Sequence, residues 1–554
     1  MRNLLISIAA ILLLEVTFGV SPARGQTDTA LITKQSVESA ERLIGLRSTE
    51  AERDSMLDAL KEYARNYDSL RTIRIDNSIP PAIMLNPIPV GFKFATERKP
   101  MEMSEVSGVK RPAKIEDLAY YSVRQLGELI RTRQLTSTEL TKLCITRLKK
   151  YDQVLHCVIA LTEERAFKQA AHADSEIAAG KYRGPLHGIP YGAKDLLAVR
   201  GYKTTWGSAP YKDQVINEDA TVIKKLDEAG AVLVAKLTMG ELAWGDVWFG
   251  EKTRNPWDTS QGSSGSSAGS ASAVSAGLVP FALGTETWGS IVSPSTRCGT
   301  TGLRPTYGRV SRTGAMALSW SMDKIGPICR NAEDCAIVFN AIIGPDGADQ
   351  TLYDAPFNYT PKVDLTELRI GYLKTDFDKD TANTANNRAT LEQLRELGAN
   401  LLEIELPKYP IEAMSFILSA EAAAAFDELT RSNRDSLMVR QIKDAWPNVF
   451  RSSRFIPAVE YIQANRFRYM MIQEMARLMD SIDVIVAPPF EGNCLLLTNL
   501  TENPCVVLPN GFDSTGHPTS VTFVGRLFDE ATALAVAKAY QDATEWNKRR
   551  PKGF

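Results

Sequence analysis

The chain has 554 residues, of which 44% are hydrophobic and 23% charged. This balance is typical of a globular protein with a large core, and it excludes an intrinsically disordered chain. The formal net charge of -2 provides no long-range field that would attract nucleic acid or an anionic membrane. A neutral or mixed small substrate is therefore expected, and the basic C-terminal run "NKRRPKGF" is interpreted as a solvated tail.

Residues 1–25 have the pattern of a cleavable signal peptide. Arg2 precedes an apolar run from Leu4 to Leu14, and small residues follow up to Gly25, after which cleavage is expected. The run is too short for a transmembrane helix, so no membrane span is predicted. Cleavage would place the mature protein in the periplasm or outside the cell. An uncleaved anchor and a misplaced start codon are the alternatives.

Seven cysteines are few for this length, and the one close pair, Cys329 and Cys335, lacks the spacing of a metal site. Neither a zinc module nor a disulfide scaffold is predicted, and no metal or other cofactor is expected. In an oxidising compartment some of the cysteines could still pair.

Residues 26–115 are expected to form an N-terminal helical extension packed on a main body. Apolar residues recur at helical spacing around Leu43 and again around Met56, which predicts two amphipathic helices. The segment "IPPAIMLNPIPVGFKF" that follows is expected to run extended, because proline is excluded from helix interiors.

Residues 116–554 show strands and helices in alternation. Thr136 and Glu139 form a capping box at a helix start, and a strand from Val232 follows a helix that stops at Gly230. The segments "ELRIGYL", "RATLEQLRELGAN" and "LLEIEL" repeat the order strand, helix, strand. Such alternation predicts an α/β sheet with helices on its faces.

The span from about Pro410 to Asp480 is predicted to be mostly helical. Aromatic residues at such spacing more often belong to the core than to a substrate pocket, and core is the preferred interpretation here. The aromatic residues concerned are Trp446, Phe450, Phe455 and Tyr461.

The stretch "QGSSGSSAGSASAVSAG" consists almost entirely of Gly, Ser and Ala, a composition typical of a flexible linker. It runs directly into "LVPFALGTETWGSI", where an apolar strand leads to a tight turn that contains Gly289 and Ser290. A serine at such a turn is well placed to act as a nucleophile, because consecutive backbone N–H groups can face a developing oxyanion. The stretch is therefore either a tether or part of an active site.

A serine nucleophile needs a base, and none of the four histidines lies in a nucleophile-elbow context. A lysine whose pKa is lowered by burial can replace histidine. Lys194 lies in the mostly neutral, apolar segment "GPLHGIPYGAKDLLAV" and is the candidate. Lys236 in "LVAKLT" has a similar setting, and either lysine could instead be an ion-paired structural residue.

The motifs "HGIPYGAKD", "GSSGSSAG" and "GTETWGSI", in this order, resemble those of the amidase signature family. The resemblance covers roughly residues 115–551. It implies one large twisted mixed β-sheet covered on both faces by helices, with the helical extension added at the N-terminus. It also implies variable substrate pockets, here built from the extension and from the region between Pro410 and Cys494.

Members of this family use a triad of two serines and a lysine, in which the peptide bond before the bridging serine is cis. By position, the resemblance makes Ser290 the nucleophile, Ser266 the bridging serine and Lys194 the general base. It assigns the oxyanion hole to the backbone amides of the turn that ends at the nucleophile, Thr287, Trp288, Gly289 and Ser290.

Several positions depart from the usual family pattern, which around the nucleophile is Asp-x-Gly-Gly-Ser-Ile-Arg. The arginine that commonly follows the nucleophile by two residues is Val292, and the resulting Glu-Thr-x-Gly-Ser-Ile variant resembles bacterial peptide amidases. Trp288 places a bulky ring beside the oxyanion turn, which is expected to narrow the substrate range. Ser264 replaces a usual glycine, and no consequence is expected from that exchange.

The sequence therefore predicts an exported, cofactor-free amidohydrolase that acts on a small-molecule or peptide amide. Two alternatives stay open. The segment "GTTGLRPTYGRVSRTGAM" also resembles the glutaminase (A) subunit of tRNA-dependent amidotransferases, although the signal peptide argues against that assignment. A non-catalytic scaffold with a degenerate site is the other alternative, and the oligomeric state is not predicted.

Overall fold

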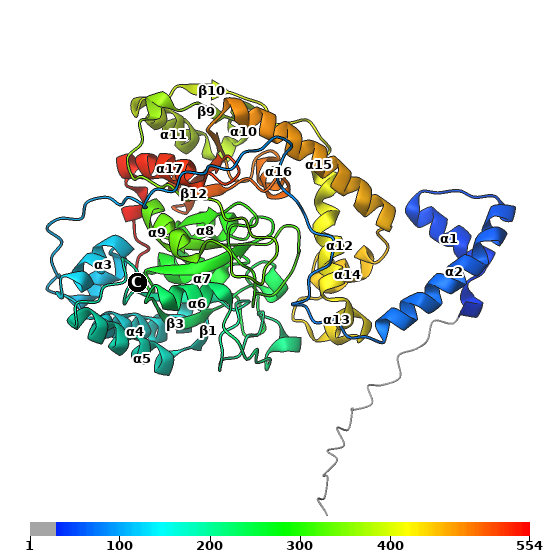
Figure 1. Ribbon diagram of the computed structural model, residues 1–554, viewed down its shortest axis with the longest axis horizontal. Helices are drawn as coiled ribbons and strands as arrows, with labels where there is room; N and C mark the ends of the chain where they lie inside the picture. Colours follow the sequence, from blue (N-terminus) through cyan, green and yellow to red (C-terminus); the bar gives the residue numbers. More distant parts are fainter. Residues whose placement is uncertain (1–28) are drawn as a thin grey trace, which may run out of the picture. The chain divides into compact units, whose positions relative to one another are not determined.

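The structure is a computed structural model in which residues 29–554 are described, so the predicted signal peptide lies outside the described residues. The chain divides into two compact units (Figure 1). One unit ends at Ile75 and the other runs from Asp76 to Phe554. Residues 76–115, which the sequence analysis groups with the extension, therefore belong to the larger unit.

The smaller unit contains the two predicted amphipathic helices, α1 (Lys34–Ile44) and α2 (Glu50–Arg71), after a short 3-10 turn, η1 (Thr29–Leu31). Each α-helix begins with a capping box in which a threonine side chain accepts a hydrogen bond from the third backbone N–H of the helix. An ion pair of 2.9 Å between Arg53 and Glu41 joins the two helices. No helix or strand forms between the end of α2 and residue 114, which confirms the extended course predicted for the proline-rich segment.

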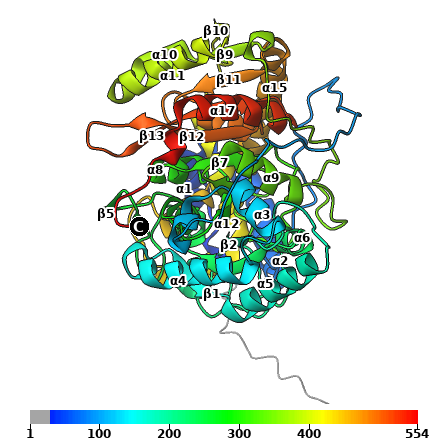
Figure 2. The same ribbon diagram turned by 90° about the vertical axis from the view of Figure 1, so that its left-hand side faces the viewer.

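An 11-stranded mixed sheet forms the centre of the larger unit (Figure 2), in the order β1-β3-β2-β6-β8-β7-β12-β13-β11-β9-β10. Parallel pairing joins β2 to β3 and β6, and β9 to β10 and β11, while the other neighbours are antiparallel. The strands are β1 (Val158–Leu161), β2 (Pro190–Lys194), β3 (Val232–Leu237), β6 (Phe281–Glu286), β7 (Thr301–Arg304), β8 (Lys324–Cys329), β9 (Ile370–Tyr372), β10 (Leu401–Glu403), β11 (Val484–Ala487), β12 (Cys505–Phe512) and β13 (Pro518–Gly525). A separate pair is formed by β4 (Arg254–Asn255) and β5 (Asp258–Gly262).

Both faces of the sheet are buried. On β6, Phe281 and Leu283 pack into one apolar cluster and Ala282 into another, because successive side chains of a strand point to opposite faces. The first face is covered by helices that include α6, α9 and α17, and the second by α4, α5, α7 and, further along the sheet, α15 and α16. The predicted architecture, a large mixed sheet with helices on both faces, is confirmed.

The helices of the larger unit follow the predicted alternation with strands, and Figure 1 shows α7 and α8 in the middle of this unit. They are α3 (Val123–Arg131), α4 (Ser137–Leu155), α5 (Glu163–Ala178), α6 (Thr221–Glu228), α7 (Ala268–Ser275), α8 (Val292–Cys298), α9 (Ala332–Ile342), α10 (Lys374–Lys379), α11 (Thr384–Glu396), α12 (Phe416–Ala425), α13 (Asp427–Arg431), α14 (Trp446–Ser453), α15 (Ala458–Ser481), α16 (Cys494–Leu500) and α17 (Glu530–Thr544). Among the described residues, no helix is long and apolar enough to span a membrane.

Local signals in the sequence position these elements. The predicted capping box of Thr136 and Glu139 begins α4. Gly230 follows α6 with a φ of +80°, and a Cβ atom there would lie 2.4 Å from the His187 ring, so glycine is required. The chain can therefore turn from α6 directly into β3.

The aromatic residues of the helical region only partly behave as predicted. Trp446 and Phe450 are buried, but Phe455 is 66% exposed, so the core assignment is wrong for that residue. Phe455 falls at the turn that ends α14, where the chain leaves the core. All seven cysteines are buried and free, so the possible disulfides do not form.

Candidate active site

Ser290 lies in the turn between β6 and α8. Gly289 has a φ of +82°, which permits the sharp change of direction just before the serine. Ser290 is only 9% exposed. The turn therefore presents a serine hydroxyl at the end of a fully buried strand, as the sequence predicts.

The Gly/Ser/Ala stretch is folded and buried, so its interpretation as a tether is wrong. It forms the end of β5, a loop and helix α7, and the peptide bond between Gly265 and Ser266 is cis, as the family resemblance implies. A Cβ atom at Gly265 would lie 1.9 Å from the Gly245 carbonyl oxygen, and one at Gly269 would lie 2.5 Å from the Cys157 carbonyl oxygen. The small residues are there because the backbone packs closely against neighbouring segments.

Lys194 lies at the end of β2 with its side chain fully buried. Its ammonium nitrogen Nζ is 2.8 Å from Ser266 Oγ, 2.8 Å from Thr285 Oγ1 and 3.1 Å from Ser267 Oγ. It also lies 3.4 Å from the Thr285 carbonyl oxygen. Every one of these acceptors is an uncharged oxygen.

Burial in this uncharged environment lowers the pKa of Lys194 to about 7, although the more distant carboxylates of Asp323 and Glu286 act in the opposite direction. A substantial fraction of Lys194 is therefore neutral near pH 7. A neutral amine that contacts a serine hydroxyl can accept its proton.

The structure brings the predicted residues of the site together. Ser266 contacts Lys194 directly, and the next residue, Ser267, donates its backbone N–H to the Ser290 carbonyl oxygen at 3.2 Å. The loop that carries Ser266 is thereby joined to the turn that carries Ser290. The predicted hole residues, Thr287, Trp288 and Gly289, line the same cavity as Ser290.

Ser267 and Thr285 also contact the Lys194 amine, and neither is predicted from the sequence. Ser267 Oγ donates to the Thr285 carbonyl oxygen at 3.0 Å and accepts from the Thr285 N–H at 3.1 Å. The two residues thus tie the start of α7 to β6 and surround the Lys194 amine with hydroxyl groups. Their proximity to the quoted serine and glycine motifs is the only sequence signal for them.

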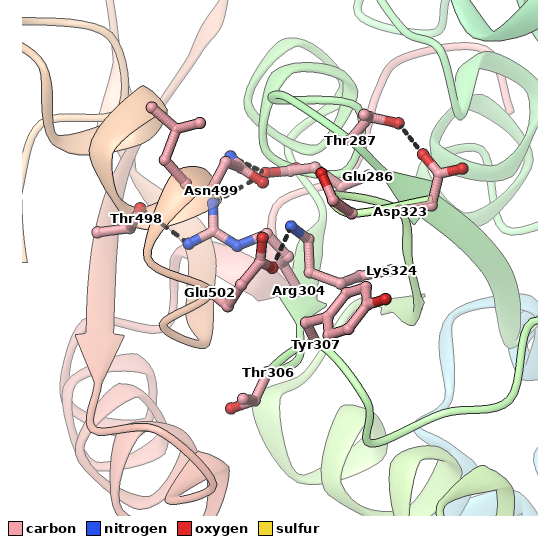
Figure 3. A network of polar contacts seen from close by, with 12 residues as sticks. Glu286, Thr287, Arg304, Thr306, Tyr307, Asp323, Lys324, Thr498, Asn499 and Glu502 are labelled. Carbon is pink, nitrogen blue, oxygen red and sulfur yellow. Dashed lines mark hydrogen bonds and ion pairs between the residues drawn. The ribbon is translucent and has the colours of Figure 1, made fainter. Parts of the chain in front are cut away.

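A buried carboxylate, Glu286, shapes the Ser290 turn (Figure 3). Its oxygen Oε2 accepts the backbone N–H groups of Ile291 and Val292 at 2.8 and 2.9 Å, and Oε1 accepts from Arg304 and Asn499 at 2.9 Å each. Burial alone would raise the pKa of Glu286, but the Arg304 guanidinium and these hydrogen bonds outweigh it and hold the pKa below its usual range. Glu286 stays ionised and holds the turn in place.

A second carboxylate, Asp323, holds the other end of the turn. The Thr287 hydroxyl donates to Asp323 Oδ1 at 2.5 Å, as Figure 3 also shows. Asp323 Oδ2 accepts the backbone N–H groups of Leu318 and Ser319 at 2.8 and 3.0 Å. The two carboxylates therefore fix the backbone around Ser290. The acidic residue at the end of the otherwise apolar strand "FALGTE" is the available sequence signal for Glu286.

Ser290 opens onto a cavity of about 810 Å³, called the Ser290 cavity below. Its lining includes Trp288, which is 43% exposed, together with Trp446 and Phe490. The last two come from the region between Pro410 and Cys494, and Trp446, although buried in the core as its spacing predicts, also lines this cavity. No histidine lines this cavity in the described part of the chain.

The structure shows the surroundings of two residues that depart from the family pattern, Val292 and Ser264. Val292 is fully buried in an apolar cluster, so the usual arginine is replaced by a core residue. Ser264 has a φ of +59°, a conformation that favours glycine, and its hydroxyl lies 2.7 Å from that of Ser293. No group of three or more metal-ligating side chains that could hold an ion is present among residues 29–554.

Comparison with known proteins identifies the family of the chain. Residues 139–534 match the amidase family. The chain belongs to the amidase family. It is therefore an enzyme of the class that acts on amide C–N bonds, and the scaffold alternative is set aside.

Relatives of this amidase include the (A) subunits of two bacterial glutamyl-tRNA(Gln) amidotransferases. The one from Chloroflexus aggregans is 36% identical over 483 residues, which covers 78% of this chain and 99% of the relative. The one from Moorella thermoacetica is 33% identical over 488 residues, 79% of this chain and 99% of the relative.

Among solved structures, the native peptide amidase of Stenotrophomonas maltophilia superposes on this amidase with a TM-score of 0.69 at 29% identity. The match covers 79% of this chain and 99% of that protein. Both kinds of comparison leave about a fifth of the chain unmatched.

Proposed function

We propose that this protein is an exported serine amidohydrolase in which Ser290 is the nucleophile, Ser266 the bridging serine and Lys194 the general base. The observation that carries the proposal is the 2.8 Å contact between Lys194 Nζ and Ser266 Oγ, made by a fully buried amine whose pKa is about 7. No cofactor is needed for this chemistry.

The reaction begins when neutral Lys194 takes the proton of Ser266 Oγ while Ser266 takes the proton of Ser290 Oγ. Ser290 Oγ forms a bond to the amide carbonyl carbon, and the carbonyl oxygen becomes an oxyanion. We assign its stabilisation to the backbone N–H groups of Thr287, Trp288, Gly289 and Ser290.

The tetrahedral intermediate then collapses. The C–N bond breaks, the nitrogen takes a proton back through Ser266, and the amine leaves while the acyl group stays on Ser290. Water attacks the acyl-enzyme and gives its proton to the same relay. The carboxylic acid is released, and Ser290 regains its proton.

Ser290→Ala tests the assignment. We expect kcat to fall by at least about 10³-fold because the nucleophile is lost, and a fluorophosphonate probe should label wild-type protein at Ser290. The matched control is Ser293→Ala, which removes a hydroxyl from the same cavity and should retain activity and labelling. Undiminished turnover by Ser290→Ala would exclude this serine as the nucleophile.

A second candidate is the glutaminase (A) subunit of an amidotransferase, which the similarity to proteins of that kind favours. The charge of the Ser290 cavity favours the amidohydrolase. Glu412 and Asp444 line it, and no Lys, Arg or His does so among the described residues. The cavity therefore offers no cationic partner to the α-carboxylate of glutamine, a charge that a C-terminally amidated peptide or an acyl anilide lacks at the reacting end.

A panel of four substrates separates the two candidates: an acyl anilide, a C-terminally amidated dipeptide, free glutamine and a fatty amide. We expect hydrolysis of at least one uncharged amide at a kcat/KM well above that for glutamine. Preferred release of glutamate from glutamine would support the second candidate instead.

Export rests on residues 1–25 and has its own test. Expression of the full chain in a bacterial host should yield protein in the periplasm or medium that begins at Gln26. Full-length protein retained inside the cell would contradict export without affecting the assignment of the triad.

A further inference from the structure

A second cavity, called the Thr285 cavity below, lies on the other side of the oxyanion turn. Its volume is about 620 Å³. It shares three wall residues with the Ser290 cavity, Ala243, Thr287 and Leu318, and it also reaches Thr285. Since Thr285 Oγ1 contacts Lys194 Nζ at 2.8 Å, this cavity approaches the site from the side of the lysine.

The outer wall of the Thr285 cavity is the proline-rich segment from Asn77 to Met84, which lies outside the family match. The Asn77 side chain fixes the segment to the loop after β7. Its Oδ1 accepts the Ala317 N–H at 2.8 Å, and its Nδ2 donates to the Ala317 carbonyl oxygen at 2.9 Å. The Asn77 amide therefore pairs with both backbone groups of Ala317, as a residue on a neighbouring β-strand would, and this fixes the position of the segment.

Most charged side chains around the Thr285 cavity already have partners. Lys324 pairs with Glu502 at 2.8 Å, and Arg312 lies 3.4 Å from Asp349 and donates to the Trp320 carbonyl oxygen at 2.7 Å. Their charges are thus largely satisfied within the protein. What remains for a ligand is mainly apolar surface, from Pro80, Pro81, Ala82, Met84, Leu196 and Met316.

In the proposed mechanism, the path by which the leaving nitrogen receives its proton determines which part of a substrate faces the Thr285 cavity. The leaving nitrogen must receive its proton from Ser266, which is held by Lys194. A substituent on that nitrogen is therefore directed toward the lysine side of the turn, where the Thr285 cavity lies. The acyl group occupies the opposite side, in the Ser290 cavity with Trp288 and Phe490.

We propose that the Thr285 cavity is the compartment for the leaving amine and that it binds an apolar alkyl or aryl substituent on the amide nitrogen. The preferred substrate is then a secondary amide, and the segment Asn77–Met84 is its specificity element. This inference rests on the proposed triad and adds the chemical class of the amine. A primary amide, which releases ammonia, would leave the compartment empty.

The test compares two substrates with the same acyl group, butyramide and N-butylbutyramide, on the full mature protein. Apolar burial of a butyl group predicts a kcat/KM at least about tenfold higher for N-butylbutyramide. Ala82→Trp adds a large side chain to the cavity wall and should remove this preference.

Val90→Trp is the matched control, because Val90 lies in the same proline-rich region but is 80% exposed and does not line the cavity. It should keep the wild-type preference. Met84→Trp is a second filling variant in case Ala82→Trp does not fold, as judged by thermal unfolding. An equal kcat/KM for the two substrates in wild type, or an unchanged preference in both filling variants, would overturn the proposal.

Labelling of Ser290 by a fluorophosphonate distinguishes failure of the amine-compartment proposal from failure of the proposed function itself. A labelled wild-type protein that hydrolyses butyramide but shows no preference for the N-butyl compound refutes only the amine compartment. A wild-type protein that neither reacts with the probe nor hydrolyses any amide refutes the proposed function and this inference with it.

Discussion

Two buried lysines on neighbouring strands have opposite surroundings. Lys194 ends β2, and Lys236 lies beside it on β3, where it pairs in register with Ala193. Both side chains are fully buried. Lys194 contacts only hydroxyl and carbonyl oxygens, whereas Lys236 lies 2.9 Å from the Asp195 carboxylate and donates to Thr204 Oγ1 at 2.6 Å.

The partners decide what each lysine can do. Burial lowers the pKa of both amines, but at Lys236 the adjacent Asp195 carboxylate works against that shift and favours the ammonium form. A buried ion pair is a structural feature whose disruption leaves a charge without a partner. A buried amine among neutral hydroxyls is poised to exchange a proton.

The largest expected difference between the two lysines is the loss of activity when each is replaced by methionine. Lys194→Met should lower kcat by about 10⁴-fold, because the relay loses its base. Lys236→Met should leave kcat of the folded fraction within about tenfold of wild type. Steady-state rates on the preferred amide check this, and a greater loss of kcat in folded Lys236→Met than in Lys194→Met would reverse the two roles.

The two substitutions should have the opposite order in stability. Lys236→Met leaves Asp195 buried without its cation and should cost about 3–5 kcal/mol in the free energy of unfolding. Lys194→Met breaks no ion pair and should cost far less. Urea denaturation of both variants measures this, and similar losses of stability would show that Lys194 also has a structural charge partner.

The pH dependence sharpens the comparison further. In the proposed relay Lys194 acts in its neutral form, so kcat/KM should rise with pH through about 7 and fall about tenfold per pH unit below that value. The lowered pKa also means that the unfolded chain binds an additional proton between about pH 7 and 10.5. Stability should therefore rise with pH in this window, and below pH 7 the full cost of burying the ammonium is present.

A pH titration of kcat/KM and of the midpoint of urea unfolding checks both signs. Lys194→Met is the reference for the stability measurement, because it lacks the titrating Lys194 amine but keeps Lys236. The difference in unfolding free energy between the two proteins should change between about pH 7 and 10. A kcat/KM that is flat from about pH 5 to 8 would contradict a base of this pKa.

The smallest expected effect on kcat comes from removing one threonine hydroxyl group beside each lysine amine. Thr285→Val removes one acceptor from Lys194 and should lower kcat about three- to tenfold, the worth of one hydrogen bond. Thr204→Val removes the corresponding acceptor from Lys236 and serves as the matched control. Its kcat should stay at the wild-type value, so equal effects in the two variants would deny Thr285 any role in the relay.

Much of the fold was predictable because its signals are local. The capping box of Thr136, the stop at Gly230 and the apolar strand before Ser290 depend on residues a few positions apart. The three motifs also predicted Lys194, Ser266 and the cis bond before it through their resemblance to a family. Phe455 shows the limit of such signals, since helical spacing does not reveal which turn of a helix leaves the core.

The carboxylates that hold the Ser290 turn were not predictable in this way. Glu286 meets Asn499, and Thr287 meets Asp323, only after the sheet has brought β6, β8 and α16 together. The wall that Asn77 and its neighbours build over the Thr285 cavity likewise comes from a segment 240 positions away from Ala317.

The sequence by itself determined the chemistry available to this protein: which side chains can attack, relay a proton and line a tight turn. The tertiary structure alone decided how the surroundings of the two buried lysines differ. Lys194 and Lys236 lie in similar sequences, and the pKa of an amine depends on burial and on the charges that surround it in space. Only the folded sheet places a carboxylate beside one lysine and hydroxyl groups beside the other.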